Sequence, residues 1–108
     1  MENDITMSYD TGKMFFAARD YITAAGWLAE VVAAAPEHEA ARLLLARSYY
    51  HSAQLGRAET QLRHIVEHNP VEAYAHLMLG RTLQRQGRDG EAVRHMRLAA
   101  AMTGGSMD

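Results

Sequence analysis

The segment His64–His68, which reads HIVEH, combines residue types and spacing that could perform metal chemistry. Two histidines four residues apart, with a glutamate just before the second, match the H-x-x-E-H pattern of inverted zinc peptidases. On a helix this spacing places both rings on one face, as a shared metal ion requires. A catalytic zinc also needs a third protein ligand, an open coordination position and a shielded cleft. The elements around HIVEH therefore decide whether it is a metal site.

Length and composition indicate one small domain with an apolar core. The chain has 108 residues, of which 48% are hydrophobic but only 7% aromatic. Its 11 basic residues against 13 acidic ones give a net charge of −2, which argues against a dedicated nucleic-acid binder. The absence of cysteine excludes disulfides and thiolate chemistry. The basic residues are nearly all arginine, which favours a GC-rich bacterial source.

The N-terminal sequence predicts where the protein resides. MENDITMSYD is acidic, and it lacks the basic start and the apolar run of a secretory signal. No apolar stretch approaches the roughly 20 residues that a membrane-spanning helix needs. We therefore expect a cytoplasmic protein without membrane contact.

A 34-residue repeat organises the chain. The two prolines, Pro36 and Pro70, are separated by one such repeat, and shifting the sequence by this interval aligns other residues. Five further columns match in size and polarity: Gly12/Ala46/Gly80, Phe15/Tyr49/Leu83, Ala24/Ala58/Ala92, Leu28/Leu62/Met96 and Val31/Ile65/Ala99. A fixed period of this length indicates stacked structural repeats.

Each copy contains two amphipathic helices, because its apolar residues recur every three or four positions. The sequence predicts helices near residues 5–17, 21–34, 39–52, 55–68, 73–86 and 89–101. Asp20 is placed to accept a hydrogen bond from an otherwise unpaired amide at the start of the second helix. The prolines end the second and fourth helices, since the residue before a proline is driven out of helical geometry. The columns of glycine and alanine mark points where two helices can approach closely.

These columns resemble the tetratricopeptide repeat, whose pattern reads W-x2-L-G-x2-Y, then A-x3-F, then P. The matching residues are Gly12, Phe15, Ala24, Leu28 and Pro36 in the first copy, Leu45, Ala46, Tyr49, Ala58, Leu62 and Pro70 in the second, and Leu79, Gly80, Leu83, Ala92 and Met96 in the third. The resemblance covers about residues 5–101, with Thr11 in place of the usual first leucine. It implies an all-α fold of three stacked helix-turn-helix repeats in a short right-handed superhelix.

The resemblance also sets the expected domain boundaries. We expect a disordered segment at 1–4, one domain at 5–102 with repeats at about 5–38, 39–72 and 73–102, and a flexible tail at 103–108. Two features depart from the family pattern. The column of the first large aromatic residue holds Ser8, Arg42 and His76, and Gly104 stands where a third proline would fall. The second departure bears on the C-terminal end, which shows no polar capping helix.

In this register HIVEH is a solvated helix face. Ile65 belongs to the buried column, so His64 and His68 lie on the outward side of their helix, where the convex surface supplies no cleft. We expect adventitious metal binding by these two histidines at most, no cofactor and no enzymatic activity. The other histidines, at positions 38, 51, 76 and 95, share no column, so nothing in the sequence suggests a common site.

The resemblance further implies that the first helix of each pair lines a concave groove that binds an extended peptide or a partner helix. The residues carried onto this groove are Tyr9, Lys13, Phe16, Leu44, Arg47, Tyr50, Tyr74, Met78, Arg81 and Arg85. Lys13, Arg47 and Arg81 form a column that is basic in all three copies, and a further groove-facing column is Ala17/His51/Arg85. Cations among aromatic and aliphatic neighbours suit a protein segment with acidic and apolar residues. The alternative is that these positions complete helix packing and a solvated rim.

A family function and a competing function can also be weighed. The positions that some relatives use to clamp chaperone tails hold Tyr9, Lys13, Leu44, Tyr74 and Met78 here, and none matches. A second class of function is self-assembly. We expect Val93, Met96 and Ala100 of the last helix to face water in a monomer and to form a homo-oligomer interface, most simply a two-fold dimer.

Overall fold

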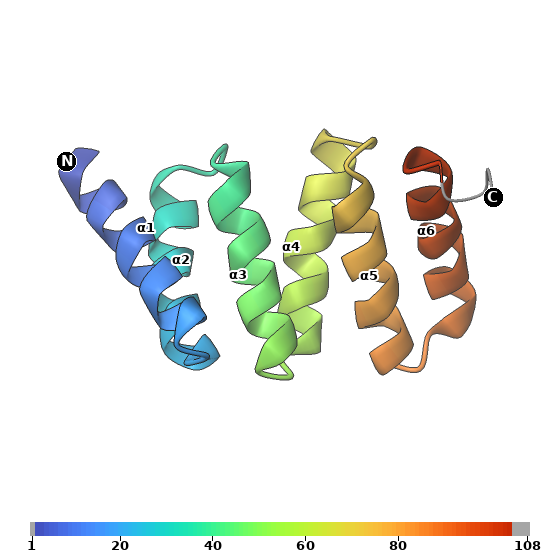
Figure 1. The fold of residues 1–108 in the computed structure, drawn as a ribbon, viewed down its shortest axis with the longest axis horizontal. Coiled ribbons are helices and arrows are strands. Elements are labelled where there is room, and N and C mark those ends of the chain that lie inside the picture. Colours follow the sequence, from blue (N-terminus) through green and yellow to red (C-terminus); the bar gives the residue numbers. More distant parts are fainter. Residues whose placement is uncertain (1, 105–108) are drawn as a thin grey trace. The chain divides into compact units, whose positions relative to one another are not determined.

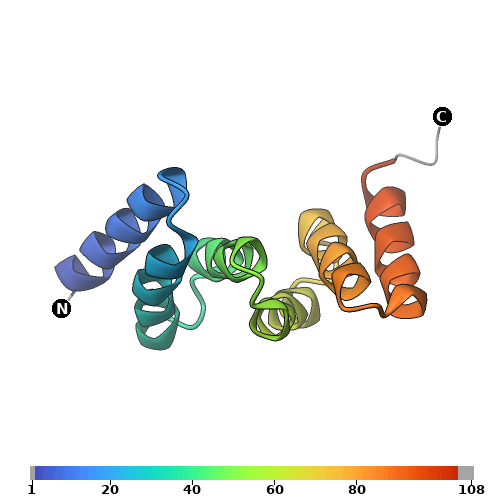
Figure 2. The same ribbon diagram turned by 90° about the horizontal axis from the view of Figure 1, so that it is seen from below.

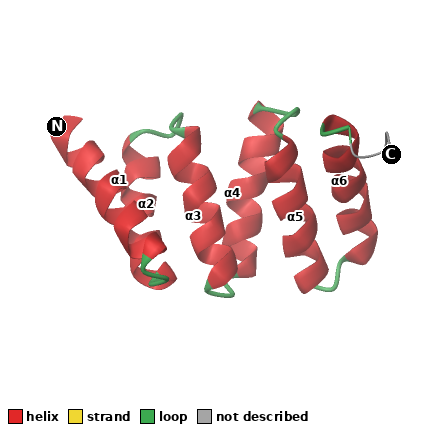
Figure 3. Cartoon of the chain, viewed as in Figure 1, coloured by secondary structure: helices red, strands yellow, loops and turns green. Residues whose placement is uncertain are grey.

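Six α-helices joined by short turns make up the described part of the chain (Figures 1 and 3). The computed structural model describes the backbone of residues 2–104 and the side chains of residues 5–104. The helices are α1 (Glu2–Ala17), α2 (Tyr21–Ala34), α3 (Glu39–His51), α4 (Leu55–His68), α5 (Ala73–Arg85) and α6 (Asp89–Met102). No strand occurs within residues 2–104, and the predicted all-α fold is confirmed. None of the described helices is both long and apolar enough to cross a membrane.

The helix boundaries follow the predicted ranges to within one residue, except at the start of α1. This helix begins at Glu2 rather than near residue 5, and Met1 of the expected disordered segment lies outside the described residues. Of the expected tail at 103–108, residues 105–108 lie outside the described part of the chain.

The turn inside each helix pair recurs with the period of the sequence repeat. Arg19, Ala53 and Gly87 adopt positive φ angles of 64°, 61° and 78°. The amide of the residue after each one closes the turn by donating to a carbonyl five residues earlier, at 2.8–2.9 Å. This is the Schellman arrangement, for which glycine is the residue that adopts the left-handed conformation without strain. The left-handed conformation therefore strains the backbone at Arg19 and Ala53, whereas Gly87 adopts it without strain.

In the second and third repeats, a polar residue stands where a large aromatic residue was expected, near the start of the first helix of the pair. Each of these polar side chains bonds to the proline that follows the preceding helix. One Nη of Arg42 donates to the carbonyl of Pro36 at 2.9 Å, and Nε2 of His76 lies 2.9 Å from the carbonyl of Pro70. The two bonds stand one repeat apart, so they are the same contact in successive copies. Burial lowers the pKa of Arg42 from its usual value. Ser8, in the first repeat, is half-buried.

The chain divides into two compact units, residues 1–54 and 55–108, with the boundary in the turn between α3 and α4. In the first unit α2 packs against both α1 and α3. Its core contains Ala24, Ala25, Leu28 and Leu45, with Phe15, Leu44 and Tyr49 packed around them. In the second unit α5 packs against both α4 and α6, and Figure 2 shows α5 and α6 side by side. Its buried side chains include Leu62, Ile65, Leu79 and Leu83.

Small residues allow the close approach of helices within each unit, as predicted. A Cβ atom on Gly12 would lie 2.8 Å from Cγ of Leu28 in α2. A Cβ atom on Gly80 would lie 2.6 Å from Cγ of Met96 and 3.2 Å from the carbonyl oxygen of Ala92, both in α6. Since real Cβ contacts are wider than this, only glycine fits at these two crossings without movement of the neighbours. The predicted crossings at Gly12 and Gly80 are confirmed.

Candidate functional site

The HIVEH histidines lie on the surface of α4 and stack on each other. Their ring centroids are 4.1 Å apart, and Nδ1 of His68 lies 2.8 Å from the carbonyl oxygen of His64. Because a carbonyl only accepts, that nitrogen carries the proton and donates. Among the described residues, no three histidine or acidic side chains are close enough together to hold a metal ion. The described part of the chain does not supply the third ligand that a catalytic zinc needs.

Two other histidines form a buried pair that the repeat columns did not predict. His76 of α5 and His95 of α6 are both buried, and their Nδ1 atoms are 3.1 Å apart. Nε2 of His76 must donate to the carbonyl of Pro70, which cannot donate in return. One proton therefore lies between the two Nδ1 atoms, and a second proton there would break the contact. The two residues stand 19 positions apart in different helices, so a comparison at the repeat interval does not reveal the pair.

The surroundings of this pair oppose a positive charge on His95. Burial, followed by the charges of Arg94, His76 and Arg63, lowers the pKa of His95, while Glu91 opposes the shift. These groups belong to α4, α5 and α6, the three helices of the second unit. Nε2 of His95 is buried and has no hydrogen-bond partner among the described residues. Neutral His95 is therefore the state that fits the fold.

This arrangement predicts a loss of stability in mild acid. The folded pKa of His95 is below the unfolded value of about 6.5, so the unfolded chain binds a proton that the folded chain resists. The stabilisation is fully present above pH 6.5 and is lost as the pH falls below it. Urea unfolding between pH 7.5 and pH 5, a range chosen about that value, should show this fall, and His95→Gln should flatten it. An unchanged slope in the variant would refute the assignment.

The groove residues expected on the first unit form two clusters. In the first, the Nζ atom of Lys13 lies 4.6 Å from the ring centroid of Tyr9 and 3.6 Å from a carboxylate oxygen of Asp10. The other neighbour of Tyr9 is His38, whose ring centroid is 4.7 Å away. Side-chain Nδ1 of His38 also accepts the amide of Ala41 and so caps α3. Tyr9 thus joins α1 to the start of α3.

The second cluster surrounds Phe16 at the end of α1. The guanidinium carbon of Arg47 lies 4.8 Å from the centroid of the Phe16 ring. Tyr21 and His51 meet the same ring edge-on at 5.2 and 6.1 Å, and they stack on each other at 4.6 Å. Tyr50 meets His51 edge-on at 5.5 Å. Helices α1, α2 and α3 thus bring together one cation, two predicted aromatic residues and two further rings.

Two members of these clusters, His38 and Tyr21, were not predicted to line the groove. His38, Tyr21 and His51 complete the two aromatic clusters, although each lies at or near the end of a helix. His51 belongs to the predicted groove-facing column Ala17/His51/Arg85 and falls on the last turn of α3. Tyr21 begins α2, and its neighbour Phe16 is reached only after the chain has reversed direction.

On the second unit, the predicted groove residues of α5 differ in accessibility. Tyr74, Arg81 and Arg85 are exposed, whereas Met78 is only 4% exposed. Met78 therefore stabilises the unit and offers a partner almost no surface. Leu44, the equivalent residue of α3, is half-buried against the core of the first unit.

A ring of four charged side chains joins α4 to α6. Glu59 contacts Arg63 at 2.8 Å and Arg88 at 2.9 Å, and Glu91 contacts the same two arginines at 3.1 and 2.7 Å. Burial alone would raise the pKa of Glu59, but the two arginines more than offset it and lower the value. The hydrogen bond from Arg88 is the main cause of the lowered pKa of Glu91. The ring fixes the start of α6 beside α4.

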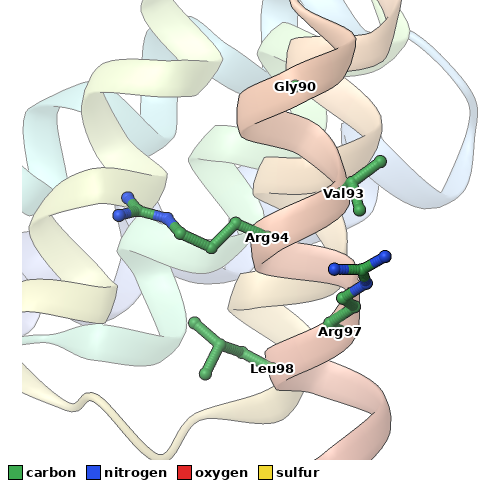
Figure 4. Close-up of a pocket in the computed structure, with 5 residues that line it drawn as sticks. All are labelled: Gly90, Val93, Arg94, Arg97 and Leu98. Atoms are coloured by element: carbon green, nitrogen blue, oxygen red, sulfur yellow. The ribbon is translucent and has the colours of Figure 1, made fainter.

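The residues predicted as an oligomer interface lie on one side of α6. Val93 and Ala100 are exposed, and Met96 is half-buried against Gly80. Val93 also lines a shallow pocket of about 330 Å³ together with Gly90, Arg94, Arg97 and Leu98 (Figure 4). In Figure 4 the arginine and apolar side chains project outward from the helix. This helix therefore presents both charged and apolar groups at its surface.

Comparison with known proteins identifies a family. A family model described as tetratricopeptide repeat matches residues 15–80 of the chain, which is more than half of its length. No curated protein gives a significant match.

Solved structures of MamA proteins share the fold. The structure titled "MamA 41-end from Desulfovibrio magneticus RS-1" has a TM-score of 0.88 and 27% identity, covering 97% of this chain and 59% of that chain. "MamA RS-1 ArsTM double mutant" has a TM-score of 0.88 and 26% identity, covering 98% and 60%. A third, "Crystal structure of MamA", is 18% identical with a TM-score of 0.89, covers 96% and 61%, and shows the fold alone. The chain thus spans about 60% of the length of the solved chains that it matches.

Proposed function

Because the chain belongs to the tetratricopeptide repeat family, we propose that it is a non-catalytic adaptor that binds an acidic and apolar segment of another protein. The surface that carries this proposal is the Phe16 cluster of the first unit, consisting of Phe16, Tyr21, Arg47, Tyr50 and His51. Tyr74, Arg81 and Arg85 of α5 provide similar chemistry on the second unit. The expected location remains the cytoplasm.

The stacking of Arg47 on Phe16 is the single observation that supports this function most strongly. The guanidinium carbon of Arg47 lies over the ring, and this cation–π contact restricts the side chain. A pre-ordered arginine loses less conformational entropy on binding, and arginine and aromatic residues often dominate binding energy.

The chemistry of the partner follows from the chemistry of this cluster. Arg47 can bind a glutamate or aspartate through two parallel hydrogen bonds. The half-buried rings of Phe16 and Tyr50 offer apolar contact beside it. A segment with a carboxylate next to a leucine or phenylalanine meets both requirements. An affinity near 1 μM, about −8 kcal/mol, is normal for such a module.

Peptide arrays provide the test. Peptides that combine acidic and large apolar residues should bind, whereas matched peptides with lysine in place of the acids should not. Arg47→Glu should abolish the binding, and Arg47→Lys should weaken it by at least tenfold, about 1.4 kcal/mol, because lysine cannot form two parallel bonds. Fluorescence anisotropy with one labelled acidic peptide measures both changes.

A charge-matched control separates this surface from general electrostatics. Arg57 is exposed on α4 and belongs to neither cluster, so Arg57→Glu should leave the affinity within a factor of two to three of the wild type. Circular dichroism of all variants checks that helicity is retained. Equal losses in Arg47→Glu and Arg57→Glu, or no preference for acidic peptides, would refute the proposal.

A second candidate function, self-association, is favoured by the exposed apolar side chains of α6. Val93 is 42% exposed, and Leu98 and Met102 of the same helix are exposed to a similar degree. Apolar groups gathered on one helix commonly mark an interaction surface. Sedimentation velocity over the micromolar range tests whether the protein associates with itself at all.

A further inference from the structure

In both units, the second helix of one pair is covered by the first helix of the next pair. In the first unit, Leu28 of α2 and Leu45 of α3 share one buried cluster. In the second unit, α5 packs against α4, and Leu62 and Ile65 of α4 are buried. The chain therefore shows twice, in separate units, how a second helix packs against the first helix of the next pair.

The last helix pair presents the same positions with no described helix over them. Met96 and Ala99 of α6 stand one repeat after Leu62 and Ile65. The groove between α5 and α6 has a volume of about 290 Å³, and its lining includes Tyr74, Leu77, Met96, Ala99, Ala100 and Thr103. We call it the α5–α6 groove. Its walls are mainly apolar. It stands at the repeat position where the first helix of a following pair would pack.

The first helix of the chain, α1, carries a surface that matches the α5–α6 groove. The buried residues Ala41, Leu45 and Ser48 of α3 are equivalent to Ala75, Leu79 and Thr82 of α5, which are also buried. At the same register positions α1 has Met7, Thr11 and Met14, which we call the α1 methionine face. Met7 is 66% exposed and Met14 is 59% exposed, whereas their counterparts in α3 and α5 are buried. Methionine is apolar and flexible, so it adapts well to a shallow groove.

We propose that the α1 methionine face of one molecule occupies the α5–α6 groove of a second molecule. The two helices would pack as α3 packs on α2 and as α5 packs on α4. This inference rests on the second candidate function, self-association, and it assigns the two surfaces that meet. A second copy is the occupant because the same chain carries both surfaces in one repeat register.

Charge complementarity across the new contact supports this occupant. In the second unit, Arg63 and Arg88 are held close together because both bind Glu59 and Glu91. Suppose that the repeats of a second molecule continue those of the first. Arg97 of the first molecule is then equivalent to Arg63, because it stands one repeat later in the sequence. Asp20 of the second molecule is equivalent to Arg88, since the two positions are two repeats apart in the sequence. The contact would then place a cation of one molecule and an anion of the other at positions that two cations occupy within the second unit.

The contact differs from the two-fold pairing of α6 expected from the sequence. It joins two different surfaces, and each added molecule leaves one of each surface available. Contacts of this kind are head-to-tail and produce open chains unless the rotation closes a ring. The protein should therefore form a series of oligomers that lengthens with concentration.

Two pairs of substitutions test the contact on the intact chain. Met7→Lys with Met14→Lys changes the α1 methionine face, and Ala100→Arg with Thr103→Arg changes the α5–α6 groove. All four positions are exposed, so both variants should retain their helicity by circular dichroism. Each variant alone should sediment as a monomer. An equimolar mixture should form a discrete 1:1 dimer, because one variant keeps the groove and the other keeps the methionine face.

The possible outcomes separate this inference from self-association itself. A wild-type protein that stays monomeric at high micromolar concentration overturns both. If the wild type associates and either variant associates as strongly, the head-to-tail contact is wrong while self-association stands. Monomeric variants that fail to dimerise when mixed also overturn it. Ile22→Lys with Thr60→Lys adds the same charge at exposed positions outside both surfaces, and it should associate like the wild type.

Discussion

Leu79→Ala should lower the free energy of unfolding by about 2–5 kcal/mol, the range found when a buried leucine is truncated and leaves a cavity. Leu79 is fully buried in α5, the helix that packs against both α4 and α6. Loss of its methyl groups therefore weakens the centre of the second unit. Thermal unfolding should show a fall of about 4–8 °C for each kcal/mol in a domain of this size.

Leu98→Ala provides the control for this prediction. Leu98 belongs to α6 and is 40% exposed, so truncation should cost no more than about 0.5 kcal/mol, as for most surface substitutions. The difference between the two losses of unfolding free energy reflects the difference in burial between Leu79 and Leu98. If both variants lost equal stability, α5 would not be the central helix of its unit.

Gly80→Leu should destabilise the protein by roughly 1–3 kcal/mol or more, because it overpacks the crossing of α5 and α6. A Cβ atom alone at this position comes within 3.2 Å of the backbone oxygen of Ala92. That oxygen cannot move without displacing α6, unlike the flexible side chain of Met96. Urea unfolding should therefore show a lower midpoint for this variant.

The same substitution at Gly26 should have the opposite sign. Gly26 lies within α2, and no atom lies within 4 Å of a Cβ built there. Leucine is favoured over glycine in a helix interior by several tenths of a kcal/mol to nearly 1 kcal/mol, so Gly26→Leu should raise stability. Destabilisation of equal size at both sites would show that glycine is needed for backbone reasons rather than for the close approach.

The sequence by itself predicted the family and nearly all of the helix boundaries, because both depend on local and periodic features. Apolar spacing, the capping carboxylate of Asp20 and the two prolines act within a few residues of where they stand. The repeat columns add longer-range information, since residues at equivalent positions occupy equivalent environments. The glycine positions at the helix crossings followed from the same columns.

The residues of the candidate site were harder to predict from the repeat columns. The columns predicted Phe16, Arg47, Tyr50 and His51 as groove residues, but they did not predict that Tyr21 would join them. Tyr21 begins α2 and meets Phe16 of α1 only after the chain has turned between these two helices. Met78 shows the opposite case, in which a position expected to line a groove packs into the core.

The tertiary structure alone decided the pairing of His76 with His95 and the ring of charges between α4 and α6. Both join residues that belong to different columns of the repeat, so a comparison of equivalent positions cannot reveal them. Such contacts depend on the directions in which side chains from two different helices point, and a comparison of repeat columns does not predict these directions. The repeat period determined which helices form and in what order, whereas the packing of those helices determined which polar groups meet, because hydrogen bonds and ion pairs require atoms to lie within about 3–4 Å of each other.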